Sequence, residues 1–180
     1  MRTIIKQIPN TITCLNLLAG CMACVVAFYG EYGLAAYVIA LAAVFDFADG
    51  FAARFLNAYS PLGKELDSLA DMVSFGLAPA IMLFSFLAQH DFLLALVAFL
   101  LTIFSALRLA KFNIDKRQTD SFIGLPTPAN AFFWAFLLKD AHSLPVFDEE
   151  QMRIVSHSVH IGDFSLSYFL FFIIIIVLIG

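Results

Sequence analysis

Charged side chains are scarce in this 180-residue sequence. They make up 13% of it, with 10 Lys and Arg against 14 Asp and Glu, whereas 62% of the residues are hydrophobic. So few basic residues provide no stripe of positive charge for a nucleic-acid backbone, which excludes nucleic acid as a partner. This much apolar surface cannot be hidden inside one globule of this size, which excludes a soluble α/β enzyme.

Cysteine is also scarce. Cys14, Cys21 and Cys24 share one apolar run with no polar metal-binding partner nearby, and we interpret them as small packing residues. The chain lacks internal repeats of about 20 to 50 residues and lacks a low-complexity linker, which predicts a single domain over residues 1–180. The last apolar run stops at Gly180 without a polar anchor, a pattern typical of a fragment of a longer chain.

The sequence has long runs with little or no charge and lacks the alternating pattern of barrel strands. We therefore predict an all-α, polytopic integral membrane protein. The opening segment, Met1–Pro9, mixes Arg2 and Lys6 with isoleucines and predicts a short interfacial helix. Six transmembrane helices are expected over residues 7–30, 32–45, 72–89, 92–107, 121–138 and 164–180.

The basic residues are distributed unevenly between the two sides of these predicted helices. If the N-terminus is cytoplasmic, the inner side receives Arg2, Lys6, Arg54, Lys64, Arg108, Lys111, Lys116 and Arg117, and the outer side receives Lys139 and Arg153. Because cytoplasmic loops are enriched in Lys and Arg, this bias predicts that both termini are cytoplasmic.

Four carboxylates lie where the second and third predicted helices approach the cytoplasmic boundary. Asp46 and Asp49 are three residues apart and share one helix face. After a loop over residues 60–63, the third helix is expected to begin with Asp67 and Asp71, which are four residues apart and also share a face. Since a short connection makes the two helices antiparallel neighbours, we expect all four carboxylates to converge.

Such a cluster needs compensation, because an aspartate near the membrane centre costs about 2.5 to 3.5 kcal/mol on insertion scales. Four hard oxygen donors with no histidine or thiol nearby indicate divalent cations, Mg²⁺ or Mn²⁺, singly or as a pair. Intramembrane acids also mark ion pathways, so a small cation or proton transporter is an alternative. That alternative does not explain the glycine, alanine and arginine residues spaced among the acids.

The full pattern is Asp46-x2-Asp49-Gly50-x2-Ala53-Arg54-x8-Gly63-x3-Asp67-x3-Asp71. It resembles the signature of the CDP-alcohol phosphotransferase family, integral membrane enzymes of phospholipid synthesis. The resemblance implies a six-helix core, usually a homodimer, in which the hydroxyl of an acceptor displaces CMP from a CDP-linked substrate.

Three further stretches narrow this resemblance. They are Pro9-Asn10-x2-Thr13-x2-Asn16-Leu17-x2-Gly20, Arg108-Leu109-Ala110-x-Phe112-Asn113 and Gly124-Leu125-Pro126-Thr127-Pro128-Ala129. They look like those of the membrane-embedded phosphatidylserine synthases of bacteria and archaea, which implies CDP-diacylglycerol as donor, L-serine as acceptor and a place in the cytoplasmic membrane. A sister enzyme that uses glycerol 3-phosphate or inositol, or a CDP-choline-type donor, is the alternative.

The resemblance also implies roles for individual residues at a site near the cytoplasmic face. Asp71 is expected to be the general base and also a metal ligand, and Asp46, Asp49 and Asp67 are expected to be the principal metal ligands. The cytidine diphosphate is expected to be surrounded by Asn10, Thr13, Gly50, Ala53, Arg54 and Gly63. Three residues near the end of the fourth span are expected to bind the acceptor carboxylate or a lipid phosphate: Arg108, Lys111 and Asn113.

Overall fold

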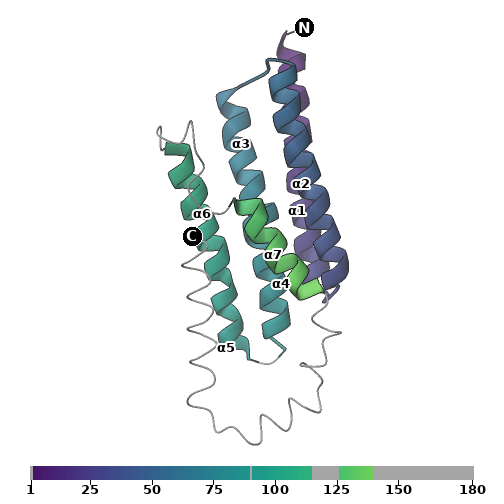
Figure 1. The fold of residues 1–180 in the computed structure, drawn as a ribbon, viewed down its shortest axis with the longest axis vertical. Coiled ribbons are helices and arrows are strands. Elements are labelled where there is room, and N and C mark those ends of the chain that lie inside the picture. The colour runs from purple at the N-terminus through teal and green to yellow at the C-terminus, as the bar shows by residue number, and fades with distance from the viewer. Residues whose placement is uncertain (1, 90, 115–125, 140–180) are drawn as a thin grey trace, which may run out of the picture.

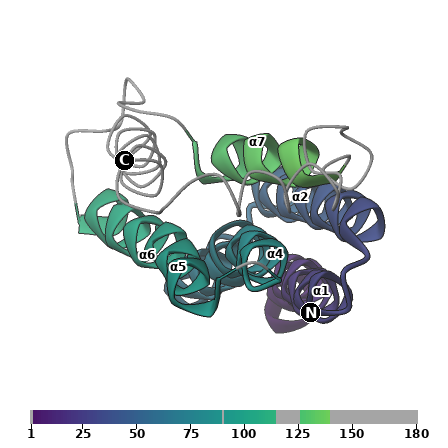
Figure 2. The ribbon, with the colours of Figure 1, turned by 90° about the horizontal axis from the view of Figure 1, so that it is seen from below.

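The structure is a computed structural model that describes residues 2–89, 91–114 and 126–139 (Figure 1). Every regular element within these ranges is helical, as predicted. The elements are α1 (Arg2–Phe28), α2 (Tyr32–Phe55), α3 (Pro61–Asp71), the π-helix η1 (Met72–Leu77), α4 (Ala78–Leu87), α5 (Phe92–Ala95), the 3₁₀-helix η2 (Leu96–Ala98), α6 (Phe99–Ile114) and α7 (Thr127–Lys139). Viewed along the bundle, α1, α4 and α6 form one layer, and α2 and α7 form a second (Figure 2).

Four segments of the described chain are long and apolar enough to cross a membrane. They are Gln7–Phe28, Tyr32–Phe55, Pro61–Leu87 and Phe92–Ile114. The first four predicted spans are therefore confirmed as helices of this kind. Within the predicted fifth span the structure describes α7, which has 13 residues. The predicted sixth span, residues 164–180, lies outside the described residues.

The prediction of a separate interfacial helix before Pro9 is wrong, because α1 runs without a break from Arg2 to Phe28. A proline inside a helix removes only the hydrogen bond that its own nitrogen would donate, and membrane helices tolerate this loss. One turn after the proline, the hydroxyl of Thr13 also donates a hydrogen bond of 3.0 Å to the Pro9 carbonyl oxygen.

Helices α1 and α2 pack closely through small residues. Ala19, Ala23 and Ala27 recur every four residues along α1 and are buried, as are Ala35 and Ala42 on α2. Small side chains let helix backbones approach each other. Close packing of this kind holds helices together in lipid, where the hydrophobic effect does not drive their association. A turn at Gly30, with φ +83°, reverses the chain between the two helices. The pair forms a rigid wall on which the remaining helices are placed.

The third transmembrane helix begins at Pro61, six residues before the predicted start near Asp67. Ser60 caps it, since its hydroxyl oxygen accepts a hydrogen bond of 3.0 Å from the backbone nitrogen of Gly63. Proline at the first helical position strengthens this start, because its missing N–H is not needed there. Gly63 therefore lies in the first turn of a helix and not in a loop.

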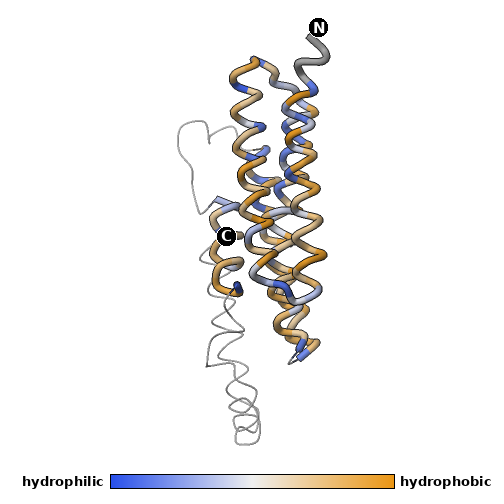
Figure 3. The backbone as a smooth tube through the Cα atoms, turned by 90° about the vertical axis from the view of Figure 1, so that its right-hand side faces the viewer, coloured by the Kyte–Doolittle hydropathy of each residue, from blue (hydrophilic) through white to orange (hydrophobic). Residues whose placement is uncertain are grey.

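A π-helix follows directly after α3, so the backbone widens immediately beyond Asp71. Single π-helical turns of this kind occur often at functional sites. Hydrophilic positions gather in the half of the bundle nearer the N-terminus and at the helix ends, while the remainder is strongly apolar (Figure 3).

Candidate functional site

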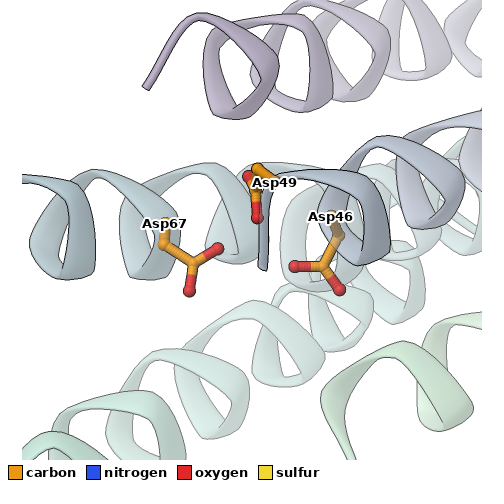
Figure 4. A group of neighbouring side chains, drawn as sticks. All are labelled: Asp46, Asp49 and Asp67. Atoms are coloured by element: carbon orange, nitrogen blue, oxygen red, sulfur yellow. The ribbon is translucent and has the colours of Figure 1, made fainter. Parts of the chain in front are cut away.

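Three of the four predicted carboxylates meet between α2 and α3. One oxygen from each of Asp46, Asp49 and Asp67 lies within 4.8 Å of the other two, and the side chains point toward a common space (Figure 4). Asp46 and Asp49 come from consecutive turns of α2, and Asp67 comes from the facing turn of α3. The convergence predicted from the spacing of these residues is confirmed for these three.

These carboxylates fit a divalent cation. Asp49 is 5% exposed, and both its Oδ2 atom and the Oδ1 atom of Asp67 are buried without a hydrogen-bond partner among the described residues. A buried acceptor without a partner is costly, and two in one cluster indicate that another ligand satisfies them. The donors are all hard carboxylate oxygens, which Mg²⁺ and Mn²⁺ prefer over nitrogen or sulfur.

Asp71 lies one helical turn beyond Asp67, outside the group of three that meet within 4.8 Å. Its carboxylate interacts electrostatically with those of Asp46 and Asp67, so it adjoins the cluster. On its other side, Oδ1 of Asp71 accepts a hydrogen bond of 3.3 Å from the amide nitrogen of Asn16 on α1. The fourth carboxylate thus adjoins the cluster and accepts a hydrogen bond from a side chain of α1.

A cavity of about 460 Å³ opens beside the cluster. It is lined by Pro9, Asn10, Thr13, Asp49, Gly50, Ala53, Ala58, Tyr59, Ser60, Pro61, Gly63, Lys64 and Asp67. The cavity is therefore bounded by α1, the end of α2 and the start of α3. Two of the three clustered carboxylates form part of its wall.

Five of the six residues predicted to surround a nucleotide line this cavity, and the sixth does not. Asn10, Thr13, Gly50, Ala53 and Gly63 are lining residues. Arg54 instead lies exposed in the last turn of α2 and is not among them.

The two glycines shape the cavity in different ways. A Cβ atom built on Gly50 would meet nothing within 4 Å, so this position opens onto free space. A Cβ atom on Gly63 would lie 3.0 Å from both Asn10 Oδ1 and Ser60 Oγ, so α1 and the start of α3 approach closely there. Gly50 leaves room for a ligand, while Gly63 lets the walls close around it.

Sequence reasoning missed Tyr59 and Lys64 as lining residues of the cavity. Both were placed in or beside a loop, because the helix was expected to start later. The pair Ser60 and Pro61, a capping residue followed by proline, is a signal that could have found them. It starts α3 early enough to bring Lys64 into its second turn, beside Gly63.

The three residues predicted to bind an acceptor carboxylate or phosphate are all on α6, but their surroundings differ. The side-chain amide nitrogen of Asn113 donates a hydrogen bond of 2.9 Å to Ser68 Oγ. The backbone carbonyl oxygen of Asn113 accepts a hydrogen bond of 3.4 Å from Lys64 Nζ. Lys111 is exposed. Arg108 carries a buried Nη2 atom without a hydrogen-bond partner in the described part of the chain. Arg108 alone therefore presents a buried, unused donor.

The chain is similar to known proteins over the part that contains this site. Residues 6–178 match the family model described as CDP-alcohol phosphatidyltransferase. The chain is 42% identical over 124 residues to the CDP-diacylglycerol–serine O-phosphatidyltransferase of Bacillus subtilis, a match covering 68% of this chain and 70% of that relative.

Other relatives are longer. An enzyme of the same name from Helicobacter pylori is 36% identical over 126 residues, which cover 68% of this chain and 53% of the relative. The archaetidylserine synthase of Methanothermobacter thermautotrophicus is 33% identical over 126 residues, covering 69% and 54%. The chain thus spans about half the length of these two relatives.

Proposed function

The chain belongs to the CDP-alcohol phosphatidyltransferase family, and from this premise we propose that it transfers the phosphatidyl group of CDP-diacylglycerol to the hydroxyl group of L-serine, releasing CMP. The observation that carries the proposal is the meeting of three carboxylates from α2 and α3 at the wall of a cavity of about 460 Å³. The choice of serine is supported by the relatives that carry the serine transferase name.

The cavity suits a cytidine diphosphate in size and lining. Ligand pockets of about 300 to 1,000 Å³ are usual for molecules of this class. Asn10 and Thr13 provide polar groups on α1, while Gly50 and Ala53 provide space on α2. Lys64 lines the same cavity and supplies positive charge for a phosphate. The acyl chains of the donor would extend into lipid from a pyrophosphate held here.

Asp46, Asp49 and Asp67 would hold Mg²⁺ or Mn²⁺, with Asp71 beside them. Such an ion, when bound, neutralises the pyrophosphate and stabilises the negative charge that develops on the departing CMP. The carboxylates would hold this ion at the wall of the cavity, and the protein otherwise acts by positioning the two substrates.

Asp71 is the proposed general base. A serine hydroxyl is a weak nucleophile at neutral pH and needs a base within hydrogen-bond reach. As the hydroxyl oxygen attacks the lipid-side phosphorus, its proton passes to the Asp71 carboxylate and a new oxygen–phosphorus bond forms. The bond from that phosphorus to the bridging oxygen breaks, and CMP leaves with the electron pair. No covalent enzyme intermediate is needed.

Arg108 is the best supported of the proposed acceptor-binding residues, because its buried Nη2 atom has an unused hydrogen to donate to a carboxylate or phosphate. Asn113 supports the site indirectly by joining α6 to α3 through Ser68. Lys111, which is exposed, suits attraction to anionic lipid. Further parts of the proposal are a site near the cytoplasmic face, cytoplasmic termini and a homodimer.

The test is release of CMP by the purified protein. The protein in detergent micelles receives CDP-diacylglycerol and Mg²⁺ or Mn²⁺, with L-serine, glycerol 3-phosphate or inositol in parallel reactions. We expect CMP and phosphatidylserine to form with serine only, and to require the metal. The Asp71→Asn variant is the matched negative control.

Two results would contradict the proposal. Faster CMP release with glycerol 3-phosphate or inositol would replace serine by another acceptor and keep the family chemistry. Cation uptake into sealed vesicles, with no CMP release for any acceptor, would favour an ion transporter instead.

A further inference from the structure

Asn16 lies in the middle of α1 and has no part in the nucleotide cavity, although it belongs to the same sequence stretch as Asn10 and Thr13, which line that cavity. It is fully buried, at 0% exposure. Its amide nitrogen donates the 3.3 Å hydrogen bond to Asp71. A buried carboxamide placed beside the proposed base needs an explanation of its own.

The backbone around Asn16 is held tightly against η1. Its carbonyl oxygen accepts a hydrogen bond of 3.0 Å from the hydroxyl of Ser74, which is itself fully buried. One turn further along α1, a Cβ atom on Gly20 would overlap Ser74 Oγ, so the two helices are in direct backbone contact there. Asn16 therefore has a fixed position on the α1 side of Asp71.

The amide of Asn16 has one sensible orientation. An ionised carboxylate only accepts hydrogen bonds, so the NH₂ group must face Asp71 and the amide oxygen must face elsewhere. That oxygen, Oδ1, is buried and has no hydrogen-bond partner among the described residues. An amide acceptor left unpaired in a buried site is costly, which indicates that a ligand supplies the donor.

Arg108, which is proposed to bind the acceptor carboxylate, lies on α6. Helix α6 runs antiparallel to α3 and η1, since Asn113 bonds Ser68 at one level and Thr102 bonds the Gly76 carbonyl at another. Arg108 lies midway between these two contacts, level with the start of η1. Its buried Nη2 atom is an unused donor, as the Asn16 oxygen is an unused acceptor. The structure thus offers a buried donor on α6 for a carboxylate and a buried acceptor on α1 for a hydrogen-bond donor.

This inference rests on the proposed function. We infer that Asn16 determines specificity for the acceptor, its Oδ1 atom receiving a hydrogen bond from the ammonium group of the amino acid while its Nδ2 atom holds Asp71. An acceptor alcohol with a carboxylate and an ammonium group then has three anchors: Arg108 for the carboxylate, Asn16 for the ammonium and Asp71 for the reacting hydroxyl. Alcohols that lack the ammonium group leave Oδ1 unpaired and are rejected.

The test compares L-serine with two analogues that each lack one anchor point. 3-Hydroxypropanoate has no ammonium group, and ethanolamine has no carboxylate. Each is measured as an acceptor by CMP release, or as a competitive inhibitor of serine if it does not react. The enzymes are the wild type, Asn16→Leu, Asn16→Asp and, as a control, Ser85→Ala, which removes another hydrogen bond to α1, the 2.8 Å bond to Ala27. CDP affinity and a monodisperse elution profile report folding.

We expect Asn16→Leu to lower kcat for every acceptor, because Asp71 loses its donor. In addition it should lose about ten- to a hundredfold of the preference for serine over 3-hydroxypropanoate, through a higher KM for serine. The KM or inhibition constant of ethanolamine should rise by a similar factor, and that of 3-hydroxypropanoate should not. Asn16→Asp keeps an acceptor oxygen and should keep the preference, while its kcat falls because Asp71 loses its donor. Ser85→Ala should leave the preference unchanged.

If Asn16→Leu changes the KM or inhibition constant of all three acceptors by the same factor, Asn16 does not select the acceptor and the inference is overturned. If Asn16→Leu does not fold, Asn16→Asp decides, because loss of the serine preference in that variant contradicts an acceptor role for the oxygen. If the wild type releases no CMP in the presence of serine, the proposed function itself is overturned. An active wild type whose Asn16 variant keeps its acceptor preference is a different result, and it overturns only the inference about Asn16.

Discussion

At the scale of single residues, the cost of burying carboxylates explains why the site must bind something. Oδ2 of Asp49 and Oδ1 of Asp67 are removed from water and have no donor among the described residues. Each such acceptor forfeits about 1 to 3 kcal/mol, and mutual repulsion among like charges adds to the loss. A divalent cation recovers this free energy, which ties the stability of the site to its occupancy.

Asp71 provides the first prediction. We expect Asp71→Asn to lower kcat for serine by about 10² to 10⁴, the usual contribution of a general base, because an amide cannot take the hydroxyl proton. The binding of CDP should persist, since Asp71 lies outside the cavity lining. Steady-state CMP release and CDP titration measure the two quantities. Activity within a factor of three of the wild type would remove Asp71 from the role of base.

Gly50 provides the second prediction, because its missing side chain faces open space. Gly50→Ala should stabilise α2 by about 0.5 to 1 kcal/mol, yet weaken CDP binding at least about tenfold as the methyl group enters the cavity. Gly33→Ala is the matched control on the same helix, with its nearest neighbouring atom 4.0 Å from the added carbon. Thermal unfolding and CDP titration follow both variants. Equal CDP affinity in the two would show that Gly50 does not border the ligand.

The identities of the clustered acids could be predicted from sequence because spacings of three and four residues fix a common helix face whatever surrounds it. The exposure of Arg54 could not, since a residue four positions after Gly50 shares its helix face whether or not the cavity extends that far. The bond of Asn113 to Ser68 was also beyond prediction, because it depends on how α6 is placed against α3.

At the scale of elements, the start of α3 decides the shape of the site. The cap at Ser60 brings residues of the first turn against α1, where Gly63 and Asn10 meet. A later start would leave this wall of the cavity to an irregular loop. The π-helix that follows α3 widens the backbone beside Asp71, where α1 and α6 both contact it.

The third prediction concerns this cap. Ser60→Ala removes the acceptor for the Gly63 nitrogen and should cost about 0.5 to 2 kcal/mol of stability, together with weaker CDP binding as the cavity wall loosens. Asp91→Ala is the matched control, because it removes the cap of α5, where the carboxylate accepts a 2.8 Å hydrogen bond from the Leu93 nitrogen. It should cost similar stability without changing CDP affinity.

Thermal unfolding and CDP titration of the two cap variants separate the effects. If both variants bind CDP like the wild type, the start of α3 does not shape the nucleotide cavity. Restoration of affinity in Ser60→Thr, which keeps a capping hydroxyl, would support the role of the cap.

Helix boundaries were harder to predict than helices. Apolar run length alone located the four spans, because a membrane helix must satisfy its own backbone over about 20 residues. The continuity of α1 through Pro9 and the π-helix after Asp71 depend on individual hydrogen bonds, which the apolar pattern does not encode.

At the scale of the whole molecule, the distribution of basic residues predicts which end of the bundle faces the cytoplasm. The fourth prediction tests this with two exposed glutamates at opposite ends, Glu31 in the α1–α2 turn and Glu65 in α3. Both substitutions are made in a cysteine-free variant expressed in bacteria. A membrane-impermeant maleimide is added to cells whose outer layers have been removed and whose cytoplasmic membrane is still closed, and it should label Glu31→Cys. It should label Glu65→Cys only after the membrane is opened. The reverse pattern would place the site on the outer face.

The central claim is that Asp46, Asp49 and Asp67 together hold a divalent ion against a nucleotide. Electron paramagnetic resonance of Mn²⁺ titrated into the purified protein, with and without CDP, measures this directly. We expect bound Mn²⁺ in the wild type, tighter binding when CDP is present, and a loss of at least about tenfold in Mn²⁺ affinity in Asp67→Asn. Equal Mn²⁺ binding by the wild type and Asp67→Asn, unaffected by CDP, would contradict it.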